Sequence, residues 1–168
     1  MTIIPYKGIS PKIDKTSFVA EGVRLIGDVR LSKDSGIWFN SVLRGDINRV
    51  EIGERTNIQD CSVLHVTEEY PVIVGNDVTV GHRAIIHGCT VGNCCLIGMG
   101  SVILDNAIVG SHSLVAAGAV VLQNFVVPEG MLVAGVPAKV IRPLTEEEKR
   151  QIQESALHYV EDARGYRS

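Results

Sequence analysis

An aliphatic residue recurs at every sixth position through most of this sequence. The longest run comprises Val91, Ile97, Ile103, Val109, Val115 and Val121. A period of six matches neither the 3.6-residue turn of an α-helix nor the two-residue alternation of an ordinary strand. It is typical of a parallel β-helix, in which each hexapeptide makes one short strand and a corner. Three hexapeptides, about 18 residues, complete one triangular coil, so the repeat predicts an all-β solenoid.

The scarcity of aromatic side chains fits this fold. Among 168 residues there are three Phe, four Tyr and one Trp, and none of them lies between Pro71 and Asn124. Coils of a β-helix stack about 4.8 Å apart, so equivalent inward positions form columns. A narrow triangular interior accommodates columns of Ile, Val and Leu, whose β-branched members favour strands, but it seldom has room for large rings.

The repeat slips in three places and ends near Val127. The interval between aliphatic positions is nine residues over 43–52, ten over 64–74 and five over 86–91. Extra residues must bulge outward at corners, and insertions in repeat folds often lie on the binding side. We therefore expect the functional residues near these irregularities.

A helix is predicted after the repeat. Thr145 and Glu148 have the spacing of a capping box, and acidic residues fill the first turn. Apolar residues at helical spacing predict a helix over about 145–163, packed along the prism. The chain is thus divided into a β-helix domain, residues 11–141, and a C-terminal helical segment, residues 142–168.

Charge and composition exclude several classes of function. The net charge is −3 and there is no basic cluster, so neither nucleic acid nor a membrane surface is an expected partner. No apolar run approaches the roughly 18 residues of a membrane span, and the N-terminus lacks a signal-peptide pattern. The four cysteines lack zinc-finger spacing, which indicates reduced, apolar residues in a cytoplasmic protein.

Successive hexapeptides occupy the three faces of the prism in turn, and assigning each one to its face places two of the five histidines above one another. Leu64 and Ile86 begin hexapeptides on the same face of successive coils. His65 and His87 directly follow them, so they point outward from equivalent positions about 4.8 Å apart. Two imidazoles at that separation can share one metal ion. His82 belongs to a different face and cannot easily reach that ion within its own chain.

A trimer of parallel prisms would bring all three histidines together. It would place His82 of one chain against the His65 and His87 face of its neighbour. Three neutral imidazoles with an open fourth position are typical of a catalytic zinc site, where bound water has a pKa of about 7. For a single histidine, an ordinary surface or hydrogen-bonded role is the simpler interpretation, and we keep it for His112 and His158.

The same counting places other polar residues. Arg44 falls into one outward column with His65 and His87, and Asp46, two residues on, is close enough to pair with Arg44. An inter-subunit salt bridge explains this pair as well as a catalytic role does. Gln59 falls one coil below the His82 region.

Three segments resemble the gamma-class carbonic anhydrase family. They are WFNSVLRGDINRVEIGERTNIQDCSVLHV, VTVGHRAIIHGCTVGNCCLIGMGSVILDNA and VAGVPAKVIRPLTEEE. The combination of the RGD, NIQD, LHV and GHxxxxHGC motifs is specific, and the resemblance runs from about Phe18 to the C-terminal helix. It implies a left-handed β-helix with a C-terminal helix, assembled as a homotrimer.

The resemblance also implies roles for individual residues. It implies that zinc, or iron or cobalt, is bound by His65, His82 and His87. It implies that Arg44 and Asp46 form an interface pair.

Further residues near the expected metal follow from the same resemblance. It implies that Gln59, held by Asn57, orients metal-bound hydroxide, and that Tyr159 lies near the metal. Well-studied active members carry a longer acidic loop for proton export after the first histidine, whereas this chain has only VTEEYPV. Glu68 lies where a proton-shuttle glutamate could be, although a solvated loop carboxylate is the commoner explanation. For Asn57, a plain corner residue is the alternative.

The expected activity is that of a metal-dependent lyase, a carbonic anhydrase that reversibly hydrates carbon dioxide to bicarbonate. One alternative is a hexapeptide acyltransferase, which would need a basic histidine and a coenzyme A groove. A thioester hydrolase using the same site is another. The last alternative is a non-catalytic trimeric scaffold with a structural metal.

Overall fold

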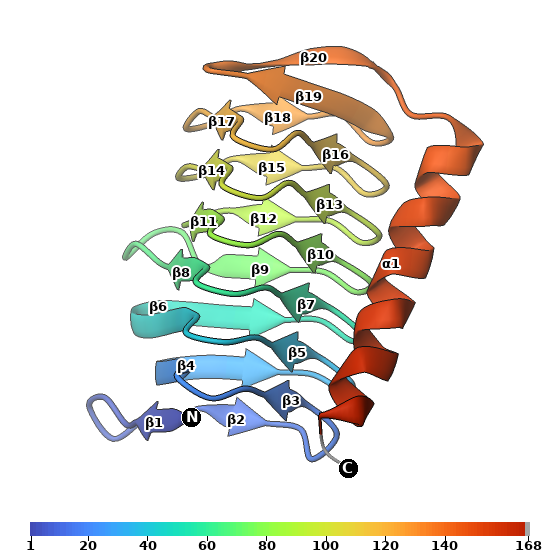
Figure 1. Ribbon diagram of the computed structural model, residues 1–168. Coiled ribbons are helices and arrows are strands. Elements are labelled where there is room, and N and C mark those ends of the chain that lie inside the picture. Colours follow the sequence, from blue (N-terminus) through green and yellow to red (C-terminus); the bar gives the residue numbers. More distant parts are fainter. Residues whose placement is uncertain (167–168) are drawn as a thin grey trace.

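The computed structural model describes residues 1–166 (Figure 1). As predicted, the chain forms a left-handed parallel β-helix of hexapeptide repeats followed by a single α-helix. The predicted C-terminal segment includes residues 167–168, which lie outside the described residues.

Each of the three faces of the prism is a stack of parallel strands. The face that packs against the α-helix, here called the helix face, contains β3 (Phe18–Val19), β5 (Gly36–Ile37), β7 (Asn57–Ile58), β10 (Thr79–Val80), β13 (Leu96–Ile97), β16 (Leu114–Val115) and β19 (Met131–Gly135). The histidine face contains β1 (Thr2–Ile4), the first halves of β4 (Arg24–Leu31) and β6 (Val42–Ile52), then β8 (Val63–His65), β11 (Ile85–His87), β14 (Val102–Ile103) and β17 (Val120–Val121). The third face contains β2 (Lys12–Ile13), the second halves of β4 and β6, then β9 (Val72–Val74), β12 (Thr90–Val91), β15 (Ile108–Val109) and β18 (Val126–Val127).

The six-residue period produces continuous columns of aliphatic side chains inside the prism. On the helix face, Ile58, Val80, Ile97 and Val115 follow one another in register from coil to coil. All four are fully buried. Burial of such columns removes apolar surface from water at every coil, which is the main stabilising contribution expected for this fold.

Two long strands bend around a corner without interruption. β6 spans the nine-residue interval in the repeat and pairs with β8 at its start and with β9 at its end. Its register against β4 shifts between Gly27 and Val29, as expected where extra residues enter a strand. The bend presents Asp46 at the corner between the histidine face and the third face.

The repeat continues beyond Val127, where its end was predicted. Val133 of β19 is fully buried and pairs with Val115 one coil below. Pro128 lies in the corner before β19, so the apparent break is an ordinary corner. The chain then reverses into β20 (Ala138–Pro143), which pairs antiparallel with β19 and covers the edge of the last coil.

Helix α1 (Glu146–Gly165) runs alongside the stack, from the last coil back toward the first (Figure 1). The predicted capping box is present, with Thr145 as the N-cap and Glu148 as its partner. The helix ends two residues later than predicted. It buries Ile152, Ala156 and Ala163 against the prism. Within residues 1–166, no helix combines the length and apolarity needed to cross a membrane.

Glu148 links the helix start to β20, and this predicts an acid-sensitive contribution to stability. Hydrogen bonds from Arg142, and then from the backbone N–H of Thr145, lower the pKa of Glu148 to about 2. A carboxyl pKa below its unfolded value contributes stability that is present above about pH 4.5 and is lost as the pH falls toward 2. We expect Glu148→Gln to lower the melting temperature at pH 6 and to flatten its decline between pH 4.5 and 2.

Glu154→Gln, in the exposed middle of the same helix, is the matched control and should leave the melting profile parallel to that of the unchanged protein. A Glu148→Gln profile that also stays parallel across this pH range would show that the contact does not stabilise the fold.

Two of the four cysteines are part of the core. Cys89 and Cys95 are buried, and burial raises the pKa of each thiol to about 12. These two side chains therefore act as small apolar residues, as the sequence indicated. All four cysteines are free.

Candidate metal centre

Two histidines stack on neighbouring strands of the histidine face. His65 ends β8 and His87 ends β11, and the strands pair in a register that sets the two residues directly opposite one another. Arg44 of β6 lies opposite His65 one coil below. The outward column of Arg44, His65 and His87 inferred from the repeat is therefore present.

The two imidazole rings of this pair face one another through one nitrogen each. Their centroids are 5.0 Å apart, and His65 Nδ1 lies 3.0 Å from His87 Nε2. Two nitrogen ligands of a tetrahedral zinc ion, each about 2.0–2.1 Å from the metal, are about 3.3 Å from one another. The separation of these two nitrogens is thus close to that required for sharing a metal.

Carboxylates hold the opposite nitrogens of both rings. His65 Nε2 lies 3.2 Å from Asp46 Oδ1, and His87 Nδ1 makes a short hydrogen bond with Asp105 Oδ1. A carboxylate on the second ring nitrogen fixes the orientation and tautomer of a metal-ligating histidine. The donor set and its surroundings therefore fit a metal.

His82 has the same arrangement at a different corner. It follows β10, and its Nδ1 lies 2.9 Å from Asp60 Oδ2. Within residues 1–166, no three histidine, cysteine or acidic side chains are placed to hold one ion. His82 accordingly stands apart from His65 and His87 in the single chain, with its Nε2 directed away from its carboxylate partner.

Asp60 and Asp105 were not singled out from the sequence. Asp105 lies 18 residues after His87, one residue beyond the position directly above that histidine, because the five-residue interval shortens this coil to 17 residues. Asp60 lies 22 residues before His82, because the ten-residue interval lengthens that coil. Coil spacing places each aspartate one coil away from its histidine, but a slip in the repeat within both coils obscured the two pairings.

The electrostatic surroundings favour a neutral His65 and a charged Asp46. Burial lowers the pKa of His65, and nearby Arg44 and His87 lower it further, against the opposing effect of Asp46. Burial raises the pKa of Asp46, but hydrogen bonds from Arg44 and His65 outweigh it and hold that pKa below its ordinary value. A metal binds the neutral form of imidazole, so the lowered pKa of His65 suits a ligand.

Gln59 and Asn57 form a buried chain of hydrogen bonds on the helix face. Gln59 Nε2 donates to Asn57 Oδ1 over 3.2 Å, and Asn57 Nδ2 donates to Thr79 Oγ1 over 3.0 Å. Both side chains are almost fully buried. β7 and β10 pair in register, which sets Gln59 one coil below the turn that carries His82.

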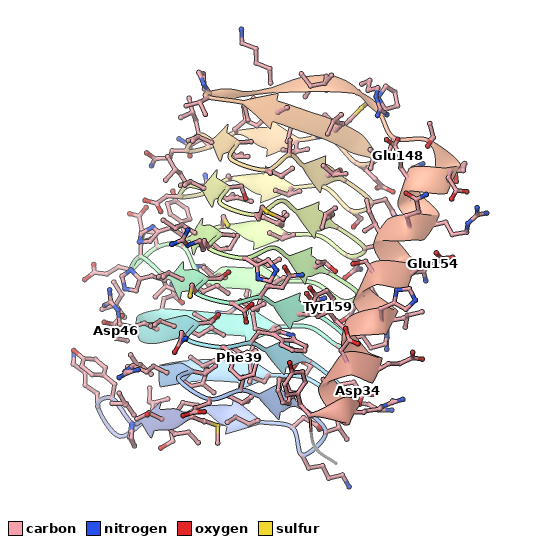
Figure 2. The ribbon with its side chains drawn as sticks, in the orientation of Figure 1. Asp34, Phe39, Asp46, Glu148, Glu154 and Tyr159 are labelled. Carbon is pink, nitrogen blue, oxygen red and sulfur yellow. The ribbon has the colours of Figure 1, made fainter. Side chains whose placement is uncertain are left out.

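Tyr159 and Glu68 lie in different environments. Tyr159 of α1 is half-buried and lines the same pocket as His82. Burial raises the pKa of Tyr159, and Asp60 and Asp162 raise it further. Glu68 lies in the exposed loop after β8, where its backbone carbonyl accepts a hydrogen bond from Asn48 Nδ2 over 3.0 Å. In Figure 2, Tyr159 reaches from the helix toward the prism, and Asp46 lies on the opposite side of the stack.

Comparison with known proteins agrees with this architecture. Residues 88–123 match the family described as bacterial transferase hexapeptide (six repeats). The protein called carbonic anhydrase in Geobacillus kaustophilus is 49% identical over 166 residues, which is 99% of this chain and 91% of the relative. The chain belongs to the hexapeptide-repeat family of gamma carbonic anhydrases and YrdA.

Other members of this gamma carbonic anhydrase and YrdA family carry different names. Protein YrdA of Escherichia coli is 48% identical over 163 residues, covering 93% of this chain and 89% of that protein. The crystal structure of a hexapeptide transferase family protein from Anaplasma phagocytophilum superposes with a TM-score of 0.94 at 44% identity, covering 98% of each chain. Membership therefore establishes the fold and family, while the reaction has to be argued from the site.

Proposed function

We propose that this protein is a metal-dependent carbonic anhydrase, a lyase that reversibly hydrates carbon dioxide to bicarbonate. The observation that carries the proposal is the convergence of His65 and His87 nitrogens, each ring backed by a carboxylate. His82 has the same carboxylate-backed geometry. The similarity to the Geobacillus protein called carbonic anhydrase supports the same reaction.

The metal would be held by His65 and His87 of one chain and by His82 of a neighbour. Zinc is the expected ion, with iron or cobalt as alternatives that imidazole also binds. When bound, such an ion supplies a water whose pKa is lowered to about 7, which makes a nucleophile available at neutral pH.

An apolar column beside the histidines supports assembly into a trimer. Val42, Val63, Ile85, Val102 and Val120 lie in register and point outward on the histidine face. Val63 and Ile85, two residues before His65 and His87, are 40% and 42% exposed in the single chain. A continuous apolar column of this kind is expected to be covered by another subunit. Three-fold symmetry would bring a neighbour's His82 corner onto it, with Arg44 and Asp46 at the edge of the interface.

Gln59 would orient the attacking water. Because Gln59 Nε2 donates to Asn57, its Oε1 is left as an acceptor for a hydrogen bond from water. Asn57 acts as a positioning residue that fixes the amide of Gln59. Tyr159 would form part of the wall of the same cavity, beside His82.

Glu68 would transfer the released proton to solvent. Its carboxylate is exposed on the loop after β8, and the Asn48 hydrogen bond anchors the backbone of that loop. We expect Glu68→Gln to lower kcat about tenfold in dilute buffer and to be rescued by concentrated imidazole buffer, with KM unchanged. Glu69→Gln, its neighbour, is the matched control. A rate that does not depend on the buffer in either variant would assign proton release elsewhere.

Asp105 should control metal affinity by orienting His87. Loss of a carboxylate behind a ligating histidine typically weakens metal binding about 10- to 100-fold. We expect this weakening in Asp105→Asn, measured by competition with a chromophoric zinc chelator. Asp34 lies at a corner of the prism beside the end of α1 (Figure 2) and is not one of the carboxylates paired with the three histidines, so Asp34→Asn should bind zinc as tightly as the unchanged protein. Equal affinity in both variants would contradict the proposed role of Asp105.

The activity itself is tested by stopped-flow hydration of carbon dioxide with the protein loaded in turn with zinc, iron and cobalt. Catalysis well above background with at least one metal is expected. Background rates with all three metals, in protein that holds about one ion per chain, would favour the non-catalytic scaffold. Activity on an acyl-coenzyme A would instead favour the acyltransferase or the thioester hydrolase. The transferase names of the matching family model and of the Anaplasma structure suggest the acyltransferase.

A further inference from the structure

The loop between β8 and β9 is closed into a short turn. Two hydrogen bonds join its ends, one from the N–H of Thr67 to the carbonyl of Tyr70 over 3.0 Å and one from the N–H of Tyr70 to Thr67 Oγ1 over 2.9 Å. Glu68 and Glu69 occupy the two central positions, and both are exposed. The ten-residue interval in the repeat therefore contains a defined turn with two glutamates at its tip.

One side of this turn is held by the bend of β6. Asn48 Nδ2 donates to the carbonyl of Glu68 over 3.0 Å, and Asn48 Oδ1 accepts from the N–H of Arg49 over 2.8 Å. Both ends of the Asn48 amide are thus fixed. The strand that carries it pairs with β8 on one side of the bend and with β9 on the other, so it is a firm anchor. Figure 1 shows the loop and the bend of β6 on the same side of the stack.

The other side of the turn packs against Gly88, the residue after the proposed ligand His87. A Cβ atom at position 88 would lie 3.3 Å from Tyr70 Cβ and 3.4 Å from Thr67 Cγ2. The φ angle of Gly88 is +51°, in the left-handed region that favours glycine. The turn approaches the strand of His87 this closely because position 88 has no side chain.

The bend of β6 also contacts the metal centre. Asp46 Oδ1 lies 3.2 Å from His65 Nε2. Asp46 and Asn48 are two residues apart, so their Cα atoms are at most about 7 Å from one another. One short segment of β6 therefore holds both a proposed metal ligand and the backbone of Glu68. It fixes the position of the glutamate relative to the metal centre.

We propose that Asn48 is a positioning residue for proton release, which keeps Glu68 within reach of the metal centre. The inference rests on the proposed hydration of carbon dioxide. Each hydration releases one proton together with bicarbonate, and the Glu68 carboxylate takes this proton and passes it to a buffer base. A carboxylate does so efficiently only from a fixed position, in contact with the proton donor or one water away from it.

Asn48→Ala should loosen the turn in the metal-free protein. It removes one side-chain hydrogen bond from the loop, so the amides of Thr67 and Tyr70 should exchange with solvent about fivefold faster, as measured by NMR. Asn76→Ala is the matched control, because Asn76 Oδ1 also makes a hydrogen bond to the backbone, accepting from the N–H of Glu54 at the corner between the third face and the helix face. It should leave both exchange rates unchanged. Unchanged exchange in Asn48→Ala would overturn the proposal.

The kinetic test separates positioning from a merely structural role. In the metal-loaded protein, Asn48→Ala should lower kcat about fivefold in dilute buffer with KM unchanged, and concentrated imidazole buffer should restore the rate. Because Asn48 acts through Glu68, adding Asn48→Ala to Glu68→Gln should cost no further activity. Asn76→Ala should hydrate carbon dioxide at the rate of the unchanged protein.

Two kinetic results would overturn the role of Asn48 alone. They are a rate loss that imidazole does not restore, and a further loss when Asn48→Ala is added to Glu68→Gln. An active protein whose rate is unaffected by Asn48→Ala would also refute this role and leave the proposed function intact. An unchanged protein that hydrates no carbon dioxide with any metal would refute the proposed function itself, and the role of Asn48 with it.

Discussion

His87→Ala should abolish metal binding and carbon dioxide hydration together. The substitution removes one of three proposed ligands and leaves the converging nitrogen of His65 without its partner. Metal content should fall from about one ion per chain to near zero, since two imidazoles from different chains hold zinc poorly. The hydration rate should fall by a factor of about a thousand or more. Elemental analysis and stopped-flow assays on the same preparation measure both effects.

His112→Ala is the control, because His112 lies at a corner beside the start of α1 and is assigned an ordinary surface role. It should retain metal and activity. If His87→Ala kept its metal and its rate, the stacked pair would not be the metal centre and the carbon dioxide proposal would lose its main support.

Ile97→Ala should destabilise the fold strongly. Ile97 is fully buried in an aliphatic column, between Val80 below and Val115 above. A narrow prism cannot collapse around the space left by the missing methylene and methyl groups, so a cost of about 2–5 kcal/mol in the free energy of unfolding is expected. Guanidinium denaturation of the metal-free protein measures it.

Ile108→Ala is the matched control. Ile108 lies on the third face and is 44% exposed, so the same chemical truncation should cost about 1 kcal/mol or less. Equal losses at the two positions would mean that the inward columns do not dominate the stability of the prism.

The face and coil on which each functional residue lies could be predicted from the sequence, because the length of the repeat is fixed. A six-residue period with three strands per coil assigns each residue to a face and a level. That was enough to predict that His65 and His87 stack, with Arg44 below them, and the strand pairing confirms it. The capping box of Thr145 and Glu148 was equally predictable, because it is local in sequence.

Features that depend on more than the repeat could not be predicted. The nine-residue interval gave no indication that β6 bends as one continuous strand, since an inserted loop has the same length. The strand β20 was missed because its antiparallel pairing with β19 breaks the parallel rule of the solenoid. Pro128 favoured a break at a position that the fold uses as a corner.

The contact between Trp38 and Tyr159 illustrates a third limit. Trp38 and Tyr159 meet because α1 folds back along the whole prism, which sets them side by side although they are 121 residues apart in sequence. Nothing in the hexapeptide pattern determines where a helix of this length will lie on the face. Likewise, the pairing of Asp60 with His82 depends on side-chain orientation at a corner, which the repeat does not encode.

The most direct test of the central claim, a metal site shared between chains, is to mix two defective proteins. His82→Ala and His87→Ala should each be inactive alone. If they are unfolded together and reassembled in equal amounts as random trimers, about one interface in four joins an intact His65 and His87 pair to an intact His82. Carbon dioxide hydration should then recover to about a quarter of that of the unchanged protein. Mixed trimers with no recovered activity, or full metal occupancy in His82→Ala alone, would contradict a site built between subunits.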